Sequence, residues 1–121
     1  MGAITSRSFD EPDEQRTPDK TEVSVVDLGG AKAARMRLAP GWKWSECIKP
    51  VVGTANCQTR HVGVGVSGSL HLVHEDGTEV DVNAGDAYVI EPGHDAWVTS
   101  AEPFVCYEFE STTAGTYATP S

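Results

Sequence analysis

Short runs of alternating apolar and polar residues follow one another through most of the chain. The pattern begins at residues 22–28 and 33–38. It continues at residues 60–66, 69–74, 79–82, 87–90, 96–99 and 104–109. A period of two predicts strands with one buried face, and no segment keeps the 3.6-residue period of an amphipathic helix. The pattern therefore predicts an all-β domain.

Turn-forming residues separate these runs. The connections include SG, EDG, NAGD, EPGHD and SAEP, which are rich in the Gly, Pro, Asn and Asp residues that turns favour. Strands spaced roughly 8–12 residues apart are typical of a sandwich or barrel. We expect a two-sheet jelly roll, because it limits exposed strand edges in a chain of this size.

Both ends of the chain lack this pattern. Residues 1–21 are polar, acidic and interrupted by two prolines. Such a segment cannot offset its ordering entropy by burial, which predicts a flexible tail or a loosely docked arm. Residues 111–121 are small and polar with Tyr117 as their one anchor, so we expect a second tail that frays. The expected jelly-roll domain spans residues 22–110.

Length and charge narrow the choice of partner. The chain has 121 residues and a formal charge of −9, from 18 Asp and Glu against 9 Lys and Arg. This length fits one small domain. The acidic excess argues against nucleic acid and membrane surfaces as partners, since both attract clustered Lys and Arg. Because no run approaches the roughly 18 apolar residues of a membrane span and no signal peptide is evident, we expect a cytoplasmic protein.

The chain contains three cysteines, Cys47, Cys57 and Cys106, without CxxC spacing. An odd number of cysteines fits reduced thiols better than a disulfide framework or a structural zinc knuckle.

Several landmarks, taken in order, carry a resemblance to a known family. They are VSG at residues 66–68, an acidic DG turn at 76–77, GD at 85–86 and EPGH at 91–94. Together they resemble the cupin superfamily over about residues 33–110. The stretches PGWKWSECIKPVVGTANCQTRHVGVGVSGSLHLV and GDAYVIEPGHDAWV are similar to those of small single-domain bacterial cupins. The resemblance implies a cupin jelly-roll barrel, or double-stranded β-helix, and it does not choose a reaction, because cupins include isomerases, oxygenases, decarboxylases and binding proteins.

The resemblance also implies a metal site, whose usual residues this chain replaces. Cupins place a His-x-His pair and a Glu on one inward strand, and a final His after the second motif. The corresponding positions here hold Ala55, Cys57, His61 and Ala96. His94, two residues before Ala96, is the imidazole nearest the last position.

Cys57, His61 and His94 form the candidate metal site, with Glu46 as a candidate fourth ligand. Cys57, Thr59 and His61 share one face of an extended strand. A thiolate with imidazoles favours zinc, iron, copper or nickel over magnesium or calcium. The alternative involves no cofactor: Cys57 is then a small buried hydrophobe, His61 a hydrogen-bonded pocket residue and His94 a turn residue. The sequence leaves both interpretations open.

Residues 42–46 (WKWSE) supply a second cluster. If this segment is extended, Trp42, Trp44 and Glu46 share a face and line the mouth of a ligand pocket. In the alternative, the tryptophans close one end of the barrel or cover a dimer interface. The residues expected to line the ligand pocket are Trp44, Thr59, Tyr88 and Trp97.

His94 and Glu46 are the expected catalytic residues, with His94 transferring a proton and Glu46 assisting. The neighbouring Asp95 either tunes His94 or accepts backbone N–H bonds in the turn. Three functions stay open: an enzyme acting on a small molecule, a non-catalytic module that senses a metabolite or metal, and a protein retained for assembly. We expect a homodimer, because paired cupins cover sheet edges and apolar faces together.

Overall fold

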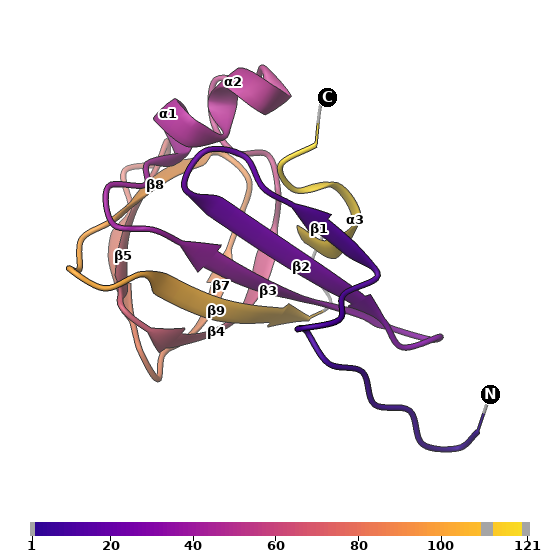
Figure 1. Cartoon of the computed structure of the whole chain (residues 1–121). Helices are drawn as coiled ribbons and strands as arrows, with labels where there is room; N and C mark the ends of the chain where they lie inside the picture. Colours follow the sequence, from indigo (N-terminus) through magenta and orange to yellow (C-terminus); the bar gives the residue numbers. More distant parts are fainter. Residues whose placement is uncertain (1, 110–112, 120–121) are drawn as a thin grey trace.

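Two antiparallel sheets face one another in the computed structural model, which describes residues 2–109 and 113–119 (Figure 1). One sheet has the strand order β1-β2-β3-β9-β4-β7 and the other the order β6-β5-β8. The strands are β1 (Glu14–Arg16), β2 (Thr21–Asp27), β3 (Lys32–Leu38), β4 (His61–Ser67), β5 (Ser69–His74), β6 (Glu79–Asn83), β7 (Ala87–Ile90), β8 (His94–Val98) and β9 (Phe104–Phe109). The short helices are α1 (Trp44–Cys47), α2 (Lys49–Val52) and α3 (Thr113–Thr116).

The eight predicted strands are present as β2 to β9, with bounds that differ by at most two residues. Their alternation brings apolar side chains to facing positions: Leu70 pairs with Val98, and Leu38 pairs with Phe104. These side chains are buried between the sheets. Each such side chain contributes about 1.5–3 kcal/mol to stability when fully buried. The prediction of an all-β jelly roll is confirmed.

Residues 44–47 form a helical turn, so the extended segment that we expected at residues 42–46 ends at Lys43. Trp44 begins α1, and α2 follows after Ile48 and is capped by Gly53, whose φ of 80° is left-handed. Figure 1 shows both helices at one end of the barrel. Trp42 and Trp44 are 2% and 1% exposed, so they close this end of the barrel, in agreement with the alternative interpretation. In the described part of the chain, no helix has the length and apolar character needed to span a bilayer.

Both segments predicted as tails contain ordered structure. Residues 14–16 form β1, which pairs with β2 at the edge of the larger sheet. The Arg16 side chain is buried, and its guanidinium donates hydrogen bonds to four backbone carbonyls of the C-terminal segment, those of Thr113, Ala114, Gly115 and Tyr117. This contact fixes residues 113–117 against the barrel.

Candidate metal centre

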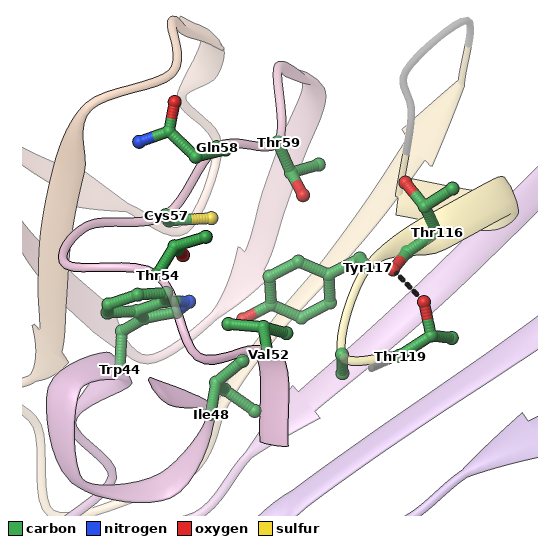
Figure 2. Close-up of a pocket in the computed structure, with 11 residues that line it drawn as sticks. Trp44, Ile48, Val52, Thr54, Cys57, Gln58, Thr59, Thr116, Tyr117 and Thr119 are labelled. Atoms are coloured by element: carbon green, nitrogen blue, oxygen red, sulfur yellow. Dashed lines mark hydrogen bonds between the residues drawn. The ribbon is translucent and has the colours of Figure 1, made fainter. Parts of the chain in front are cut away.

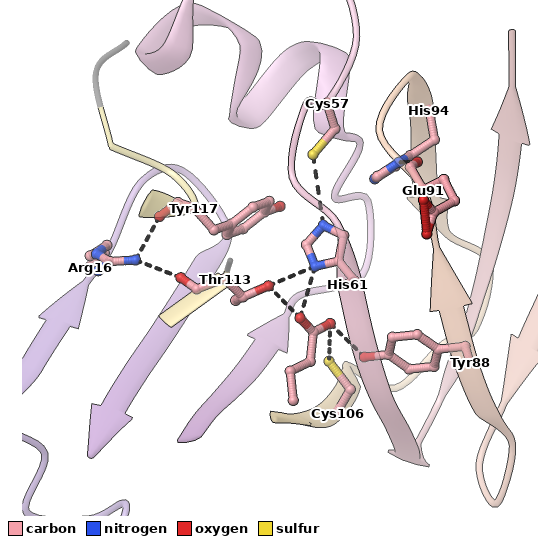
Figure 3. Close-up of polar contacts among 10 residues, drawn as sticks. Arg16, Cys57, His61, Tyr88, Glu91, His94, Cys106, Thr113 and Tyr117 are labelled. Atoms are coloured by element: carbon pink, nitrogen blue, oxygen red, sulfur yellow. Dashed lines mark hydrogen bonds and ion pairs between the residues drawn. The ribbon is translucent and has the colours of Figure 1, made fainter. Parts of the chain in front are cut away.

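Cys57, His61 and His94 meet inside the barrel (Figure 3). All three are buried, and one ligand atom from each lies within 4.8 Å of the others. Sγ of Cys57 is 3.7 Å from Nε2 of His61, and the two imidazole rings stand edge to face with centroids 5.3 Å apart. The structure therefore brings together the three predicted metal ligands.

The backbone explains why Cys57 and His94 are neighbours. Cys57 donates its N–H to the carbonyl of His94 at 2.8 Å and accepts the N–H of Gly93 at 2.7 Å. His94 begins β8 and is buried like Ala96 and Val98. A shift of two residues along a strand keeps the same face, so His94 points inward as a histidine at position 96 would. His94 is thus a strand residue and not the turn residue of the alternative interpretation.

Each imidazole is oriented through its second nitrogen. Nδ1 of His61 lies 2.8 Å from Oε1 of Glu108, and Nδ1 of His94 lies 2.8 Å from the backbone carbonyl of Glu91. An acceptor at Nδ1 keeps the proton of a neutral imidazole there and leaves the Nε2 lone pair available. In known metal sites, histidine ligands are oriented by partners of this kind.

Glu108 is the centre of a buried hydrogen-bond network. It is 1% exposed and accepts hydrogen bonds from the Tyr88 hydroxyl at 2.6 Å and from the Thr113 hydroxyl. Burial opposes its ionisation, but the charge of His61 and these hydrogen bonds outweigh burial and lower the pKa of Glu108. Burial and the nearby acidic groups raise the pKa of Tyr88, which stays a donor. Glu108 is therefore a fixed carboxylate that orients His61.

Sequence reasoning missed Glu108. The signal was its parity, because in β9 it alternates with Tyr107 and shares the inward face with Phe104 and Cys106. A carboxylate on an inward face of a β-barrel requires partners, and here His61 and Tyr88 supply them.

Burial and hydrogen bonds act in opposite directions on the cluster. Burial alone would raise the pKa of the Cys57 thiol, but hydrogen bonds from His61 and His94 lower it to about 6. Burial also opposes protonation of His61, yet the charge of Glu108 raises the pKa of His61 to about 10. The metal-free site therefore pairs a Cys57 thiolate with a protonated His61, and metal binding would release the proton from Nε2 of His61.

Gly63 in β4 leaves no room for a side chain next to Glu108. A Cβ at Gly63 would clash with the backbone carbonyl oxygen of Tyr107 and would lie 2.8 Å from Cγ of Glu108 and 3.0 Å from the Tyr88 hydroxyl. We expect Gly63→Ala to lower the free energy of unfolding by about 1–3 kcal/mol through overpacking, as measured by urea unfolding. Gly30→Ala is the control, since a Cβ there meets nothing within 4 Å. Equal losses in both variants would contradict this explanation.

Two predicted site residues lie outside the barrel. Glu46 is exposed on α1, because the helical turn directs it away from the side chains of Trp44 and Cys47, which are buried. The prediction of Glu46 as fourth ligand and catalytic residue is therefore wrong. Trp97 alternates with the inward Ala96 and lies on the outer face of β8, where it packs on His71 with centroids 4.9 Å apart. Trp97 is not a pocket residue.

Asp95 has the structural role that we considered as the alternative. Its Oδ1 accepts the backbone N–H of Ser45 at 3.2 Å and that of Ala96 at 2.9 Å. Asp95 therefore fixes the start of α1 against β8. Both of these hydrogen bonds go to backbone N–H groups and neither goes to the His94 imidazole.

Three cavities adjoin the cluster. One of them, of about 240 Å³, is lined by His94, Tyr88 and residues of β5 and β6. The inner cavity, of about 20 Å³, lies among His61, His94, Tyr88 and Glu108, and it is large enough for one water-sized species. The outer pocket, of about 230 Å³, lies between the α1–α2 segment, residues 54–59 and residues 116–119 (Figure 2). Trp44 and Tyr117 line both the inner cavity and the outer pocket, whereas Cys57 and Thr59 line the outer pocket.

Solved structures with the same arrangement define the class of fold. A cupin 2 conserved barrel domain protein from Salinispora arenicola superposes with a TM-score of 0.61 at 18% identity, over 89% of this chain and 88% of that one. A protein with a double-stranded β-helix domain from Klebsiella pneumoniae gives a TM-score of 0.58 at 19% identity, over 90% and 89%. The oxalate decarboxylase of Bacillus subtilis, described for its Mn(II) centres, gives 0.62 at 19% identity over 90% of this chain.

This chain spans only 30% of the length of that oxalate decarboxylase chain. No protein-family model matches the sequence, and no curated protein matches it. The three structures nevertheless agree in architecture with the two sheets of Figure 1. The chain therefore has the cupin fold, a double-stranded β-helix, as the sequence resemblance implied.

Proposed function

We propose that this cupin binds one transition-metal ion and presents it to a small molecule in the outer pocket. Sγ of Cys57 and the Nε2 atoms of His61 and His94 would hold the ion. One observation carries the proposal. Nδ1 of each imidazole lies within hydrogen-bond distance of an acceptor, and the three ligand atoms lie within 4.8 Å of one another.

The spacing of the Cys57 and His61 ligand atoms fits tetrahedral coordination. Zinc–sulfur and zinc–nitrogen bonds of about 2.3 and 2.0–2.1 Å place two tetrahedral ligand atoms about 3.6 Å apart. Sγ of Cys57 and Nε2 of His61 are 3.7 Å apart. Three protein ligands also leave one position open, as in catalytic zinc sites.

The thiolate distinguishes this ligand set from an oxygen-rich one. Oxygen ligands suit manganese, whereas thiolate with imidazole suits zinc, iron, copper and nickel. We therefore expect one of these four metals at Cys57, His61 and His94. When bound, such an ion would act as a Lewis acid and polarise an oxygen of the small molecule in the outer pocket. The chain itself contributes orientation, with Glu108 holding His61 and the Glu91 carbonyl holding His94.

Composition of the outer pocket supports a sensing module as the second candidate function. None of its described lining residues is Asp, Glu, His, Lys or Arg, so beyond Cys57 it offers few groups for proton transfer. An enzyme would form a product from the bound molecule. A sensor would be stabilised against unfolding by the same molecule without forming a product.

Cobalt(II) provides a spectroscopic test of the metal site. Metal-free protein titrated with Co²⁺ is expected to bind one equivalent and to develop the near-ultraviolet charge-transfer absorption of a cobalt–thiolate bond. Cys57→Ser is expected to remove this band, because it replaces the sulfur ligand. Cys47→Ser is the matched control, since Cys47 is also buried but belongs to α1 and lies outside the cluster. A band that survives Cys57→Ser would contradict the proposal.

A further inference from the structure

We infer that the outer pocket takes a small, uncharged carbonyl compound, whose oxygen accepts a hydrogen bond from Nε1 of Trp44. This inference deepens the proposed function and rests on its small-molecule role. It names the chemical class of the molecule that would lie beside the Cys57 cluster.

Trp44 carries a donor that the described part of the chain does not satisfy. The residue is 1% exposed and its Nε1 has no hydrogen-bond partner there. Nε1 of the neighbouring Trp42, by contrast, donates to the Thr21 hydroxyl at 2.9 Å. Figure 2 shows the Trp44 nitrogen on the side of the indole that faces Tyr117 across the pocket. An indole N–H only donates, and leaving a buried donor unpaired is costly, so the missing partner is an acceptor.

The lining of the pocket indicates that this acceptor is uncharged. The described lining residues are Trp44, Ile48, Val52, Thr54, Cys57, Gln58, Thr59, Thr116, Tyr117, Ala118 and Thr119. None carries a positive charge, and the whole chain has a formal charge of −9. In the metal-free protein, burying a carboxylate or phosphate here would leave its charge without a cation among the described lining residues, which is strongly unfavourable.

The size and walls of the pocket restrict the molecule further. Its volume of about 230 Å³ is below the roughly 300–1,000 Å³ of pockets for drug-sized ligands. Ile48, Val52 and Ala118 form apolar walls, and four threonines and Gln58 add polar groups to the same lining. A mainly apolar molecule with one strong acceptor satisfies both the walls and the indole.

A carbonyl oxygen is the neutral acceptor that best suits a pocket next to the cluster of Cys57, His61 and His94. Cys57 lies in the pocket lining, and the Tyr117 ring that lines the same pocket contacts His61 with centroids 5.1 Å apart. A carbonyl held by Trp44 is therefore adjacent to the proposed metal ligands. Carbonyls are also the groups that a Lewis-acidic metal activates.

Three probes of similar shape test the inference on metal-free protein. They are acetophenone, α-methylstyrene, in which a methylene replaces the carbonyl oxygen, and benzoate. In NMR titrations, wild-type protein is expected to bind acetophenone about fivefold more tightly than α-methylstyrene, the effect of one neutral hydrogen bond. Benzoate is expected to bind at least about tenfold more weakly than acetophenone, because its charge is unpaired.

Trp44→Phe removes the donor and keeps an aromatic ring. It is expected to bind both neutral probes equally, whereas Trp97→Phe, on the outer face of β8, is expected to keep the fivefold preference. Equal binding of the neutral probes by wild-type protein would overturn the inference, and this comparison needs no variant to fold. A preference that persists in Trp44→Phe, or tighter binding of benzoate, would also overturn it. Because the protein is metal-free, the result is independent of the cobalt test.

Discussion

Replacing Glu108 with alanine is expected to lower the free energy of unfolding by about 3–5 kcal/mol, the cost of removing one partner of a buried charged pair. The Glu108 side chain is 1% exposed and pairs with Nδ1 of His61 at 2.8 Å. It also accepts the hydrogen bond of the Tyr88 hydroxyl. Without the carboxylate these groups stay buried and lose an acceptor. Urea unfolding followed by circular dichroism measures the loss.

Two further variants separate charge from packing. Glu108→Gln keeps the shape and an acceptor for Tyr88, so we expect a smaller loss of stability than in Glu108→Ala. We also expect its metal affinity to fall about 10–100-fold, because the partner that orients His61 has lost its charge. Glu102→Ala removes an exposed carboxylate in the turn before β9 and is expected to change stability by less than about 0.5 kcal/mol. Similar losses at Glu102 and Glu108 would contradict the role assigned to the buried network.

Replacing Arg16 with methionine is expected to cost roughly 3 kcal/mol or more, because hydrogen bonds from a charged donor contribute about 1.5–3 kcal/mol each. The guanidinium donates to four carbonyls between Thr113 and Tyr117, three of them at 2.8–2.9 Å. Methionine fills the space but leaves these carbonyls without that donor. We therefore also expect faster amide hydrogen exchange at Tyr117, which measures release of the C-terminal segment.

Two substitutions, Arg16→Lys and Arg35→Met, provide the controls. Arg16→Lys is expected to recover only part of the stability, since an ammonium is a point charge without the planar fork of arginine. Arg35→Met removes a partly exposed arginine whose ion pairs are with exposed Asp10 and half-exposed Glu22, and is expected to cost less than about 1 kcal/mol. If Arg35→Met destabilised the protein as much as Arg16→Met, the Arg16 contact would not be the cause.

Local patterns were sufficient to predict the strands, because strands such as β5, β8 and β9 alternate between buried and less buried positions and are bounded by turn residues. They failed at residues 44–52, where two four-residue helices are too short to show a helical period. They also failed at β1 and at residues 113–117. These segments are polar, and Arg16 fixes them through a contact that spans about a hundred positions of sequence.

The candidate site was predicted only in part, for similar reasons. Strand parity identified Cys57 and His61 as residues of one inward face. The same parity explains why His94 also points inward, because it lies two residues before Ala96 on the same strand. Glu46 was assigned from an extended segment that is helical, and Trp97 from a strand whose inward face belongs to Ala96. The homodimer, the small-molecule partner and the cytoplasmic location remain predictions.

The metal content of purified protein tests the central claim most directly. Cells are grown in medium supplemented with zinc, iron, copper and nickel, and metal per chain is measured by elemental analysis of wild-type protein and of Cys57→Ala. Three converging ligands with oriented imidazoles predict about one equivalent in wild-type protein and a large loss in Cys57→Ala. Less than about a tenth of an equivalent in the wild-type protein would contradict the claim that this barrel holds a metal.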